Sequence, residues 1–84
     1  MLRAMNLYFI EVDGVSARRL YGLADRYRDQ GAYVVLGGPH VASFPEEALR
    51  HADTIFLGAG ADAWPCFLAE YELGLERRVY ARIH

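Results

Sequence analysis

Three short apolar segments, each followed by glycine, constrain the fold of this chain more than any other feature. They are residues 7–12, 32–36 and 54–57, and the glycines after them are Gly14, Gly37 and Gly58. Between and after these segments, apolar residues recur at helical spacing. The expected helices cover about 17–30, 44–51 and 63–73. Strands alternating with helices of this length predict an α/β fold with a parallel sheet and right-handed crossovers.

The first two expected helices carry recognisable signals at their ends. Ser16 is a suitable N-cap for the first helix, and Gly31 follows it where a C-cap glycine belongs. Ser43 and Glu46 have the spacing of a capping box at the start of the second helix. Gly22 lies inside the first helix, where glycine costs about 1 kcal/mol against alanine. We therefore expect close packing against the sheet at that position.

The third expected helix is rich in apolar residues. Cys66 lies within it, and cysteine is among the most buried residue types, so we expect a structural role for Cys66. The side chains that this helix is expected to bury are Trp64, Phe67, Leu68 and Tyr71.

The length of the chain allows one domain, over residues 1–84. Three strands are few for a doubly wound sheet, which usually has five or six. The pattern therefore predicts a partial flavodoxin-like or Rossmann-like three-layer fold. Residues 78–83 alternate between apolar and polar, which suits either a short fourth strand or an extended tail. So small a chain buries only about 60% of its unfolded surface, so association with another chain is expected to add burial.

The basic residues and the cysteine content exclude several classes of protein. All nine basic residues are arginines, they are scattered, and the net charge is −2, which argues against nucleic-acid binding. Without lysine there is neither a Walker A loop nor a Schiff-base nucleophile. A single cysteine cannot hold an iron–sulfur cluster or form an internal disulfide. No apolar run reaches the roughly 18–20 residues of a membrane span, and no signal peptide is evident, so we expect a cytoplasmic protein.

The candidate binding residues follow the expected strands, because ligands of open parallel sheets lie beyond the carboxyl ends of the strands. The segments there are 11–15, 37–43 and 58–62. Gly37 and Gly38 either form a tight turn or let a ligand approach the backbone closely. Pro39 and His40 complete this corner, and no carboxylate partner for His40 is evident. No catalytic set is complete, which favours a binding function.

Two alternatives remain open on the residues alone. Residues 58–63 read G-x-G-x-x-A between a strand and a helix, which is the pattern of a dinucleotide fingerprint. The acidic residue expected about 20 positions later is missing, and Arg77 and Arg78 stand near there. A small nucleotide-binding domain is thus one alternative, and a module that only self-associates is the other.

Several segments resemble a known family. They are similar to the cobalamin-binding domain that precedes the radical-SAM domain in B12-dependent radical-SAM proteins, among them the anaerobic magnesium-protoporphyrin monomethyl ester cyclases. The resemblance covers about residues 7–82 and matches only the last three strand–helix units of that flavodoxin-like domain. The segments that carry it are residues 21–28, 34–41, 45–49, 52–53 and 64–65.

The resemblance implies a cobalamin ligand across the strand ends, without an iron–sulfur cluster in this chain. The family often has serine at the position of Glu11 and a Gly-Glu-x-Glu-like stretch where this chain has residues 58–61. Its first two strands are absent, and so is the D-x-H-x-x-G motif that supplies a cobalt ligand in other B12 proteins. The residues that the resemblance and the strand ends assign to cofactor binding are Glu11, Val12, Gly37, Gly38, Pro39, His40, Gly58 and Gly60.

These features predict a partial cobalamin-binding module without catalysis of its own, with a radical-SAM domain as a candidate partner. The missing strands would leave the strand over residues 7–12 with an unpaired edge. Long apolar edges pair readily with another chain. We therefore expect a homodimer or larger homo-oligomer.

Overall fold

The computed structural model describes residues 6–58 and 60–81. These residues form a parallel four-stranded sheet in the order β1-β2-β3-β4. The strands are β1 (Leu7–Glu11), β2 (Tyr33–Gly37), β3 (Thr54–Leu57) and β4 (Val79–Ala81). The helices are α1 (Ala17–Asp29), α2 (Pro39–Ser43), α3 (Pro45–Leu49) and α4 (Gly60–Glu72). The predicted α/β fold with a parallel sheet is confirmed, and the end of the chain contributes a short edge strand.

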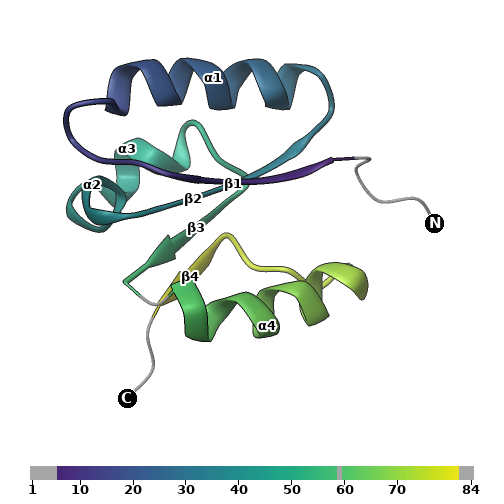
Figure 1. Ribbon diagram of the computed structural model, residues 1–84. Helices are drawn as coiled ribbons and strands as arrows, with labels where there is room; N and C mark the ends of the chain where they lie inside the picture. Colours follow the sequence, from purple (N-terminus) through teal and green to yellow (C-terminus); the bar gives the residue numbers. More distant parts are fainter. Residues whose placement is uncertain (1–5, 59, 82–84) are drawn as a thin grey trace.

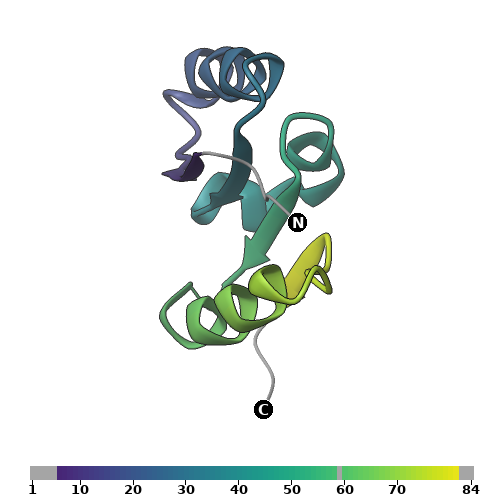
Figure 2. The same cartoon turned by 90° about the vertical axis from the view of Figure 1, so that its right-hand side faces the viewer.

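The helices lie on both faces of the sheet and make three layers. Helices α1, α2 and α3 cover one face, and α4 covers the other (Figures 1 and 2). Going from β1 to β2 and from β3 to β4, the chain moves across the sheet in the same direction. The helices that make these two connections, α1 and α4, lie on opposite faces of the sheet. The crossover through α4 is therefore left-handed, whereas those through α1 and through α2 and α3 have the usual right hand. The prediction of right-handed crossovers is wrong at α4, because α4 covers apolar side chains that the other helices leave bare.

Two apolar cores follow from the alternation of side chains along the strands. In β2, Val34 and Leu36 face α1–α3, whereas Val35 faces α4. All three are fully buried, which explains the continuous apolar sequence of this strand. The core under α4 is largely aromatic, and its buried members are Val35, Phe56, Ala63, Phe67, Tyr71 and Tyr80.

The helix ends differ in part from the sequence predictions. Ser16 is the N-cap residue of α1, but its side chain makes no capping bond, and its backbone N–H donates to Asp13 Oδ1 at 2.8 Å. Gly31 follows the helix with φ of 89°, as predicted for a C-cap glycine. The capping box at Ser43 is wrong, because Ser43 ends α2 and Phe44 precedes α3. Helix α4 begins at Gly60, earlier than the predicted start near residue 63.

Three burial predictions are also wrong. Gly22 is exposed, and no atom lies within 4 Å of a Cβ placed on it, so it makes no close approach to the sheet. Cys66 is exposed and Leu68 is 40% exposed. The buried stripe of α4 runs through Ala63, Phe67 and Tyr71, at intervals of one helical turn. That stripe turns Cys66 and Leu68 outward.

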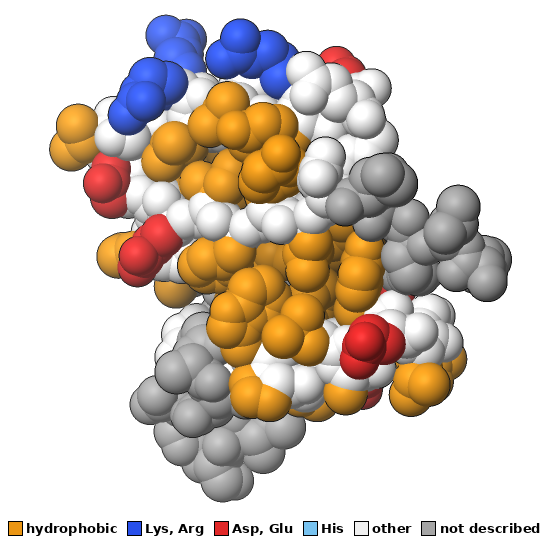
Figure 3. Space-filling view, turned by 45° about the vertical axis from the view of Figure 1, so that its right-hand side comes forward, with side chains coloured by type: hydrophobic (Ala, Val, Ile, Leu, Met, Phe, Trp, Pro, Cys, Tyr) orange, Lys and Arg blue, Asp and Glu red, His pale blue; other side chains and the backbone are white. Residues whose placement is uncertain are grey.

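Strand β1 lies at an edge of the sheet with β2 as its one neighbour among the described strands, which agrees with the predicted unpaired edge. Helix α4 covers the β3–β4 half of its face and leaves the β1 side partly uncovered. Phe9, in the middle of β1, is 42% exposed. Apolar side chains gather along this part of the surface, above and below a strip of exposed backbone (Figure 3).

Candidate functional site

The carboxyl ends of β1, β2 and β3 meet at one end of the sheet. Glu11 at the end of β1 is in register with Gly37 at the end of β2, and Gly58 directly follows β3. We call the surface formed by Glu11, Val12, Gly37, Gly38 and Gly58 the rim. The sequence prediction that the glycine corners share one edge is confirmed.

The corner at Gly37 and Gly38 is closed by the chain itself. Gly38 has φ of 104° and ψ of 177°, and a Cβ there would lie 2.8 Å from both Glu11 Cγ and Val12 O. A Cβ on Gly37 would lie 3.0 Å from the Phe9 ring. Val12 is fully buried, and its N–H donates to Gly37 O at 2.8 Å. Of the two interpretations left open for this pair of glycines, the geometry favours the tight turn.

The corner at Gly58 is open. Gly58 has φ of 75° and is exposed, and no atom of the described residues beyond its chain neighbours lies within 4 Å of a Cβ placed on it. Glu11, at the end of β1, is exposed as well. Gly60 begins α4, so the G-x-G-x-x-A stretch does run from a strand into a helix, with residue 59 outside the described residues. Within the rim, a ligand therefore has access mainly at Glu11 and Gly58.

His40 contacts α1 and α3 instead of lying free in a loop. It belongs to α2, which follows Gly38 directly, and its Nε2 lies 2.8 Å from Glu47 Oε1. The hydrogen bond with His40 holds the pKa of Glu47 below its usual value. The interpretation that His40 lacks a carboxylate partner is wrong. Because α2 and α3 are separate helices joined at Phe44, helical spacing along the sequence gave no signal for this pair.

A second histidine–carboxylate pair lies nearby and was not predicted. His51 Nδ1 is 2.9 Å from Asp25 Oδ1, and the His51 ring stacks on Tyr21 with 4.4 Å between centroids. Burial raises the pKa of Tyr21 to about 12, and the nearby Glu47 carboxylate adds to that rise. Both pairs line a cleft of about 610 Å³ between α1 and α3. The lining residues are Gly14, Ala17, Arg18, Tyr21, Gly22, Asp25, His40, Glu47, Arg50 and His51.

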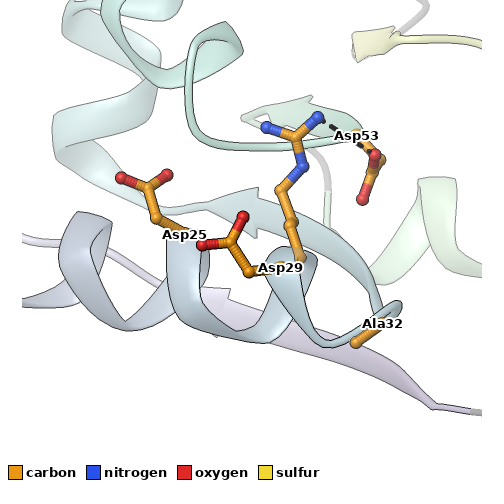
Figure 4. Close-up of a pocket in the computed structure, with 5 residues that line it drawn as sticks. Asp25, Asp29, Ala32 and Asp53 are labelled. Carbon is orange, nitrogen blue, oxygen red and sulfur yellow. Dashed lines mark ion pairs between the residues drawn. The ribbon is translucent and has the colours of Figure 1, made fainter.

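A further pocket lies at the opposite end of the sheet from the rim, where β2 and β3 begin. Figure 4 shows the three aspartates that line it, Asp25, Asp29 and Asp53. Arg28 also lines the pocket, and its guanidinium lies 3.3 Å from Asp53 Oδ1. The other oxygen of Asp53 accepts the backbone N–H of Val34 at 2.8 Å. Asp25 is hydrogen-bonded to His51. These carboxylates therefore hold α1, β2 and the start of β3 together.

Arg77 and Arg78 lie just before β4, also away from the rim. The Arg77 side chain lies 3.2 Å from Glu70 Oε1 and covers the Tyr80 ring at 4.5 Å. Arg78 donates to the backbone oxygens of Leu49 and Ala52 at 2.7 and 3.1 Å. Both arginines thus bind the chain itself and do not supply the missing partner of a dinucleotide site.

The described part of the chain holds neither a metal site nor a membrane span. No group of three or more His, Cys, Asp or Glu residues there could hold a metal ion. No helix there is both long enough and apolar enough to cross a membrane.

The fold and the rim define a three-layer α/β domain whose strand ends are partly open to a ligand. No family model matches the chain. A bacteriochlorophyllide d C-8(2)-methyltransferase from Chlorobaculum tepidum is 44% identical over 54 residues, which are 64% of this chain and 12% of that enzyme. The N-terminal domain of a hypothetical protein from Thermotoga maritima has a TM-score of 0.79 and 22% identity. The match covers 93% of this chain and 62% of that structure, and it concerns the fold alone.

Proposed function

We propose that this chain forms one side of a cobalamin-binding site. The observation that carries the proposal is the common rim, at which three parallel strands end within segments that resemble a cobalamin-binding domain. The 44% identity with a methyltransferase supports it, because cobalamin is a carrier of methyl groups. The chain spans only 12% of that enzyme, so the rest of such a site would come from other segments.

The rim suits this ligand in part. Exposed backbone at Gly58, which no described side chain covers, can receive the face of a large flat molecule. The exposed carboxylate of Glu11 can accept hydrogen bonds from the amide groups at the edge of a corrin ring. Gly37 and Gly38 form the tight turn at the end of β2, but neighbouring atoms fill the space beside them, so they offer a ligand little access. His40 is hydrogen-bonded to Glu47.

The residues of this chain would bind and orient, and the bound cobalamin would supply the methyl-transfer chemistry. The rim holds one titratable side chain in an exposed position, Glu11, and no partner beside it that would complete a general acid–base pair among the described residues. We expect catalysis to require a further domain, with a radical-SAM domain as the candidate. A cytoplasmic location remains a prediction.

Titration of the chain with hydroxocobalamin, followed by its visible spectrum and by equilibrium dialysis, tests the proposal. We expect saturable binding that Glu11→Ala weakens about threefold or more, because one charge-assisted hydrogen bond is lost. Glu46→Ala is the matched control, since Glu46 is an exposed glutamate of α3 outside the rim, and it should bind as the wild type does. Absence of binding at millimolar cobalamin, or binding that Glu11→Ala leaves unchanged, would overturn the proposal. Saturable binding of NADPH instead would favour the nucleotide alternative.

A further inference from the structure

Two arginines line the cleft between α1 and α3 without an ion pair in the described part of the chain. Arg18 lies in the first turn of α1, and Arg50 directly follows α3. Both residues are exposed. The ion pairs among the described residues involve other cationic side chains, those of Arg28, His40, His51 and Arg77. A guanidinium group donates two parallel hydrogen bonds to the oxygens of a phosphate, so the cleft offers two such groups to an anion.

The two carboxylates of the cleft are already hydrogen-bonded to histidines. Glu47 Oε1 lies 2.8 Å from His40 Nε2, and Asp25 Oδ1 lies 2.9 Å from His51 Nδ1. With both histidines neutral, the two carboxylates balance the charge of the two arginines. With both histidines protonated, the cleft carries a net positive charge, and histidine is the side chain that ordinarily changes its charge between about pH 5 and 8. An anion in the cleft would therefore favour the protonated histidines.

The amino end of α1 adds to the positive potential of this cleft. Gly14 and Ala17, on either side of the N-cap residue Ser16, are lining residues. Ser16 makes no side-chain capping bond, and the first turn holds no acidic residue, so its backbone N–H groups have no carboxylate beside them within the turn. Asp13 accepts the N–H of Ser16 and is not among the lining residues. The helix end therefore acts in the same direction as the two arginines.

Tyr21 supplies a buried hydroxyl at the same cleft. The residue is 7% exposed, and its hydroxyl makes no hydrogen bond of standard geometry with a described residue, although Glu47 lies nearby. Buried hydroxyl groups nearly always have a hydrogen-bond partner. An oxyanion beside Tyr21 would supply the missing acceptor.

We propose that this cleft binds the phosphate group of a small phosphate ester, held by Arg18 and Arg50. His51 can add a hydrogen bond from Nε2 when protonated, because Asp25 occupies Nδ1. The volume of about 610 Å³ is typical of sites for small organic ligands, so the organic part of the ester has room beside its phosphate. No residue of the rim lines the cleft, so this inference does not depend on the proposed function.

NMR titration of the isotope-labelled full chain with inorganic phosphate, glycerol phosphate and glycerol, at constant ionic strength, tests the proposal. We expect saturable shifts at Arg18, Arg50 and His51 with both phosphate compounds and none with glycerol. Glycerol phosphate should bind more tightly than inorganic phosphate, because its organic part also contacts the cleft. Tighter binding of inorganic phosphate would overturn the assignment to an ester and identify the free ion as the ligand.

Substitution of the arginines locates the site. Arg18→Gln and Arg50→Gln should each weaken the binding of glycerol phosphate about tenfold, because charge-assisted hydrogen bonds are lost. Arg19→Gln is the matched control, since Arg19 is an exposed neighbour in α1 that does not line the cleft, and it should bind as the wild type does. No saturation at millimolar glycerol phosphate, or equal binding by all three variants, would overturn the proposal.

Sulfate tests the contribution of the histidines, because its own charge does not change in the range in which histidine titrates. The charged or titratable side chains that line the cleft are Arg18, Tyr21, Asp25, His40, Glu47, Arg50 and His51. Of these residue types, histidine alone ordinarily titrates between about pH 8 and 6, so we expect sulfate to bind more tightly as the pH is lowered through that range. An affinity for sulfate that does not change with pH would contradict the charge balance on which the proposal rests and overturn it.

Discussion

Replacing Gly38 with alanine tests whether the second glycine of the rim is required by the fold. With φ of 104° and ψ of 177°, Gly38 occupies a backbone region that is essentially restricted to glycine, at a cost of about 1–3 kcal/mol for other residues. The added Cβ would also lie 2.8 Å from Val12 O and 2.9 Å from Val12 N. These are backbone atoms of a buried residue, and relieving such overpacking costs about 1–3 kcal/mol more. We expect the free energy of unfolding to fall by about 2–6 kcal/mol.

That loss is large for so small a domain, since 84 residues correspond to a total stability of roughly 4–13 kcal/mol. Urea unfolding followed by far-UV circular dichroism measures it. Gly58→Ala is the control, because Gly58 also has positive φ, at 75°, but no described residue other than its chain neighbours comes within 4 Å of an added Cβ. Backbone strain alone should cost Gly58→Ala about 1–2 kcal/mol. Equal losses for the two variants, or a loss below about 1 kcal/mol for Gly38→Ala, would refute the reasoning.

Three more predictions concern buried or paired polar groups. Thr54→Val should lower the free energy of unfolding by about 1–3 kcal/mol, since the Thr54 hydroxyl pairs with Tyr33 Oη at 2.6 Å and donates to Arg77 O at 2.8 Å. The raised pKa of Tyr21 means that its contribution to stability is complete below pH 10 and is lost as the pH rises towards 12, a loss that Tyr21→Phe should abolish in alkaline urea titrations. The pKa of Glu47 is lowered by its hydrogen bond with His40, so its contribution is present at neutral pH and disappears on acidification. Glu47→Gln should therefore destabilise the protein at neutral pH and have less effect in acid.

Each of these three predictions has an outcome that contradicts it. For Thr54, an unchanged urea midpoint in the valine variant would mean that its two hydrogen bonds contribute nothing net. For Tyr21, identical alkaline unfolding of the wild type and the phenylalanine variant would mean that ionisation of another group causes the loss of stability. For Glu47, a loss of stability in the glutamine variant that does not change with pH would mean that the charge of Glu47 contributes nothing through its pair with His40.

The strand pattern was predictable from sequence because it depends on local chemistry. The run over residues 32–36 is apolar at every position, and β2 is indeed buried on both faces apart from its first residue. The same holds for the glycine that ends α1, because Gly31 adopts a positive φ that follows from helix geometry. Both features depend only on residues that are neighbours along the chain, so they can be predicted without the tertiary structure.

The surroundings of the polar residues were not predictable in the same way. His40 was expected in a loop without a carboxylate, yet Pro39–Ser43 form a helix and Glu47 approaches His40 from α3. Cys66 was expected to be buried, but the helix turns it to the surface. Both outcomes depend on how a helix is rotated against the sheet, which spacing within one segment does not specify.

By itself, the sequence determined that this chain alternates strands and helices and that its strands end in glycine corners, because apolar periodicity and the freedom of glycine are local properties. Only the tertiary structure decided which corner is open. The space beside Gly38 is filled by Glu11 and Val12, whereas no neighbour fills the space beside Gly58 in the described part of the chain. It also decided that α4 crosses with the opposite hand and covers the β3–β4 half of its face, so β1 stays partly uncovered there. The physical reason is that burial is shared between segments distant in sequence, so it appears only when their side chains compete for the same faces of the sheet.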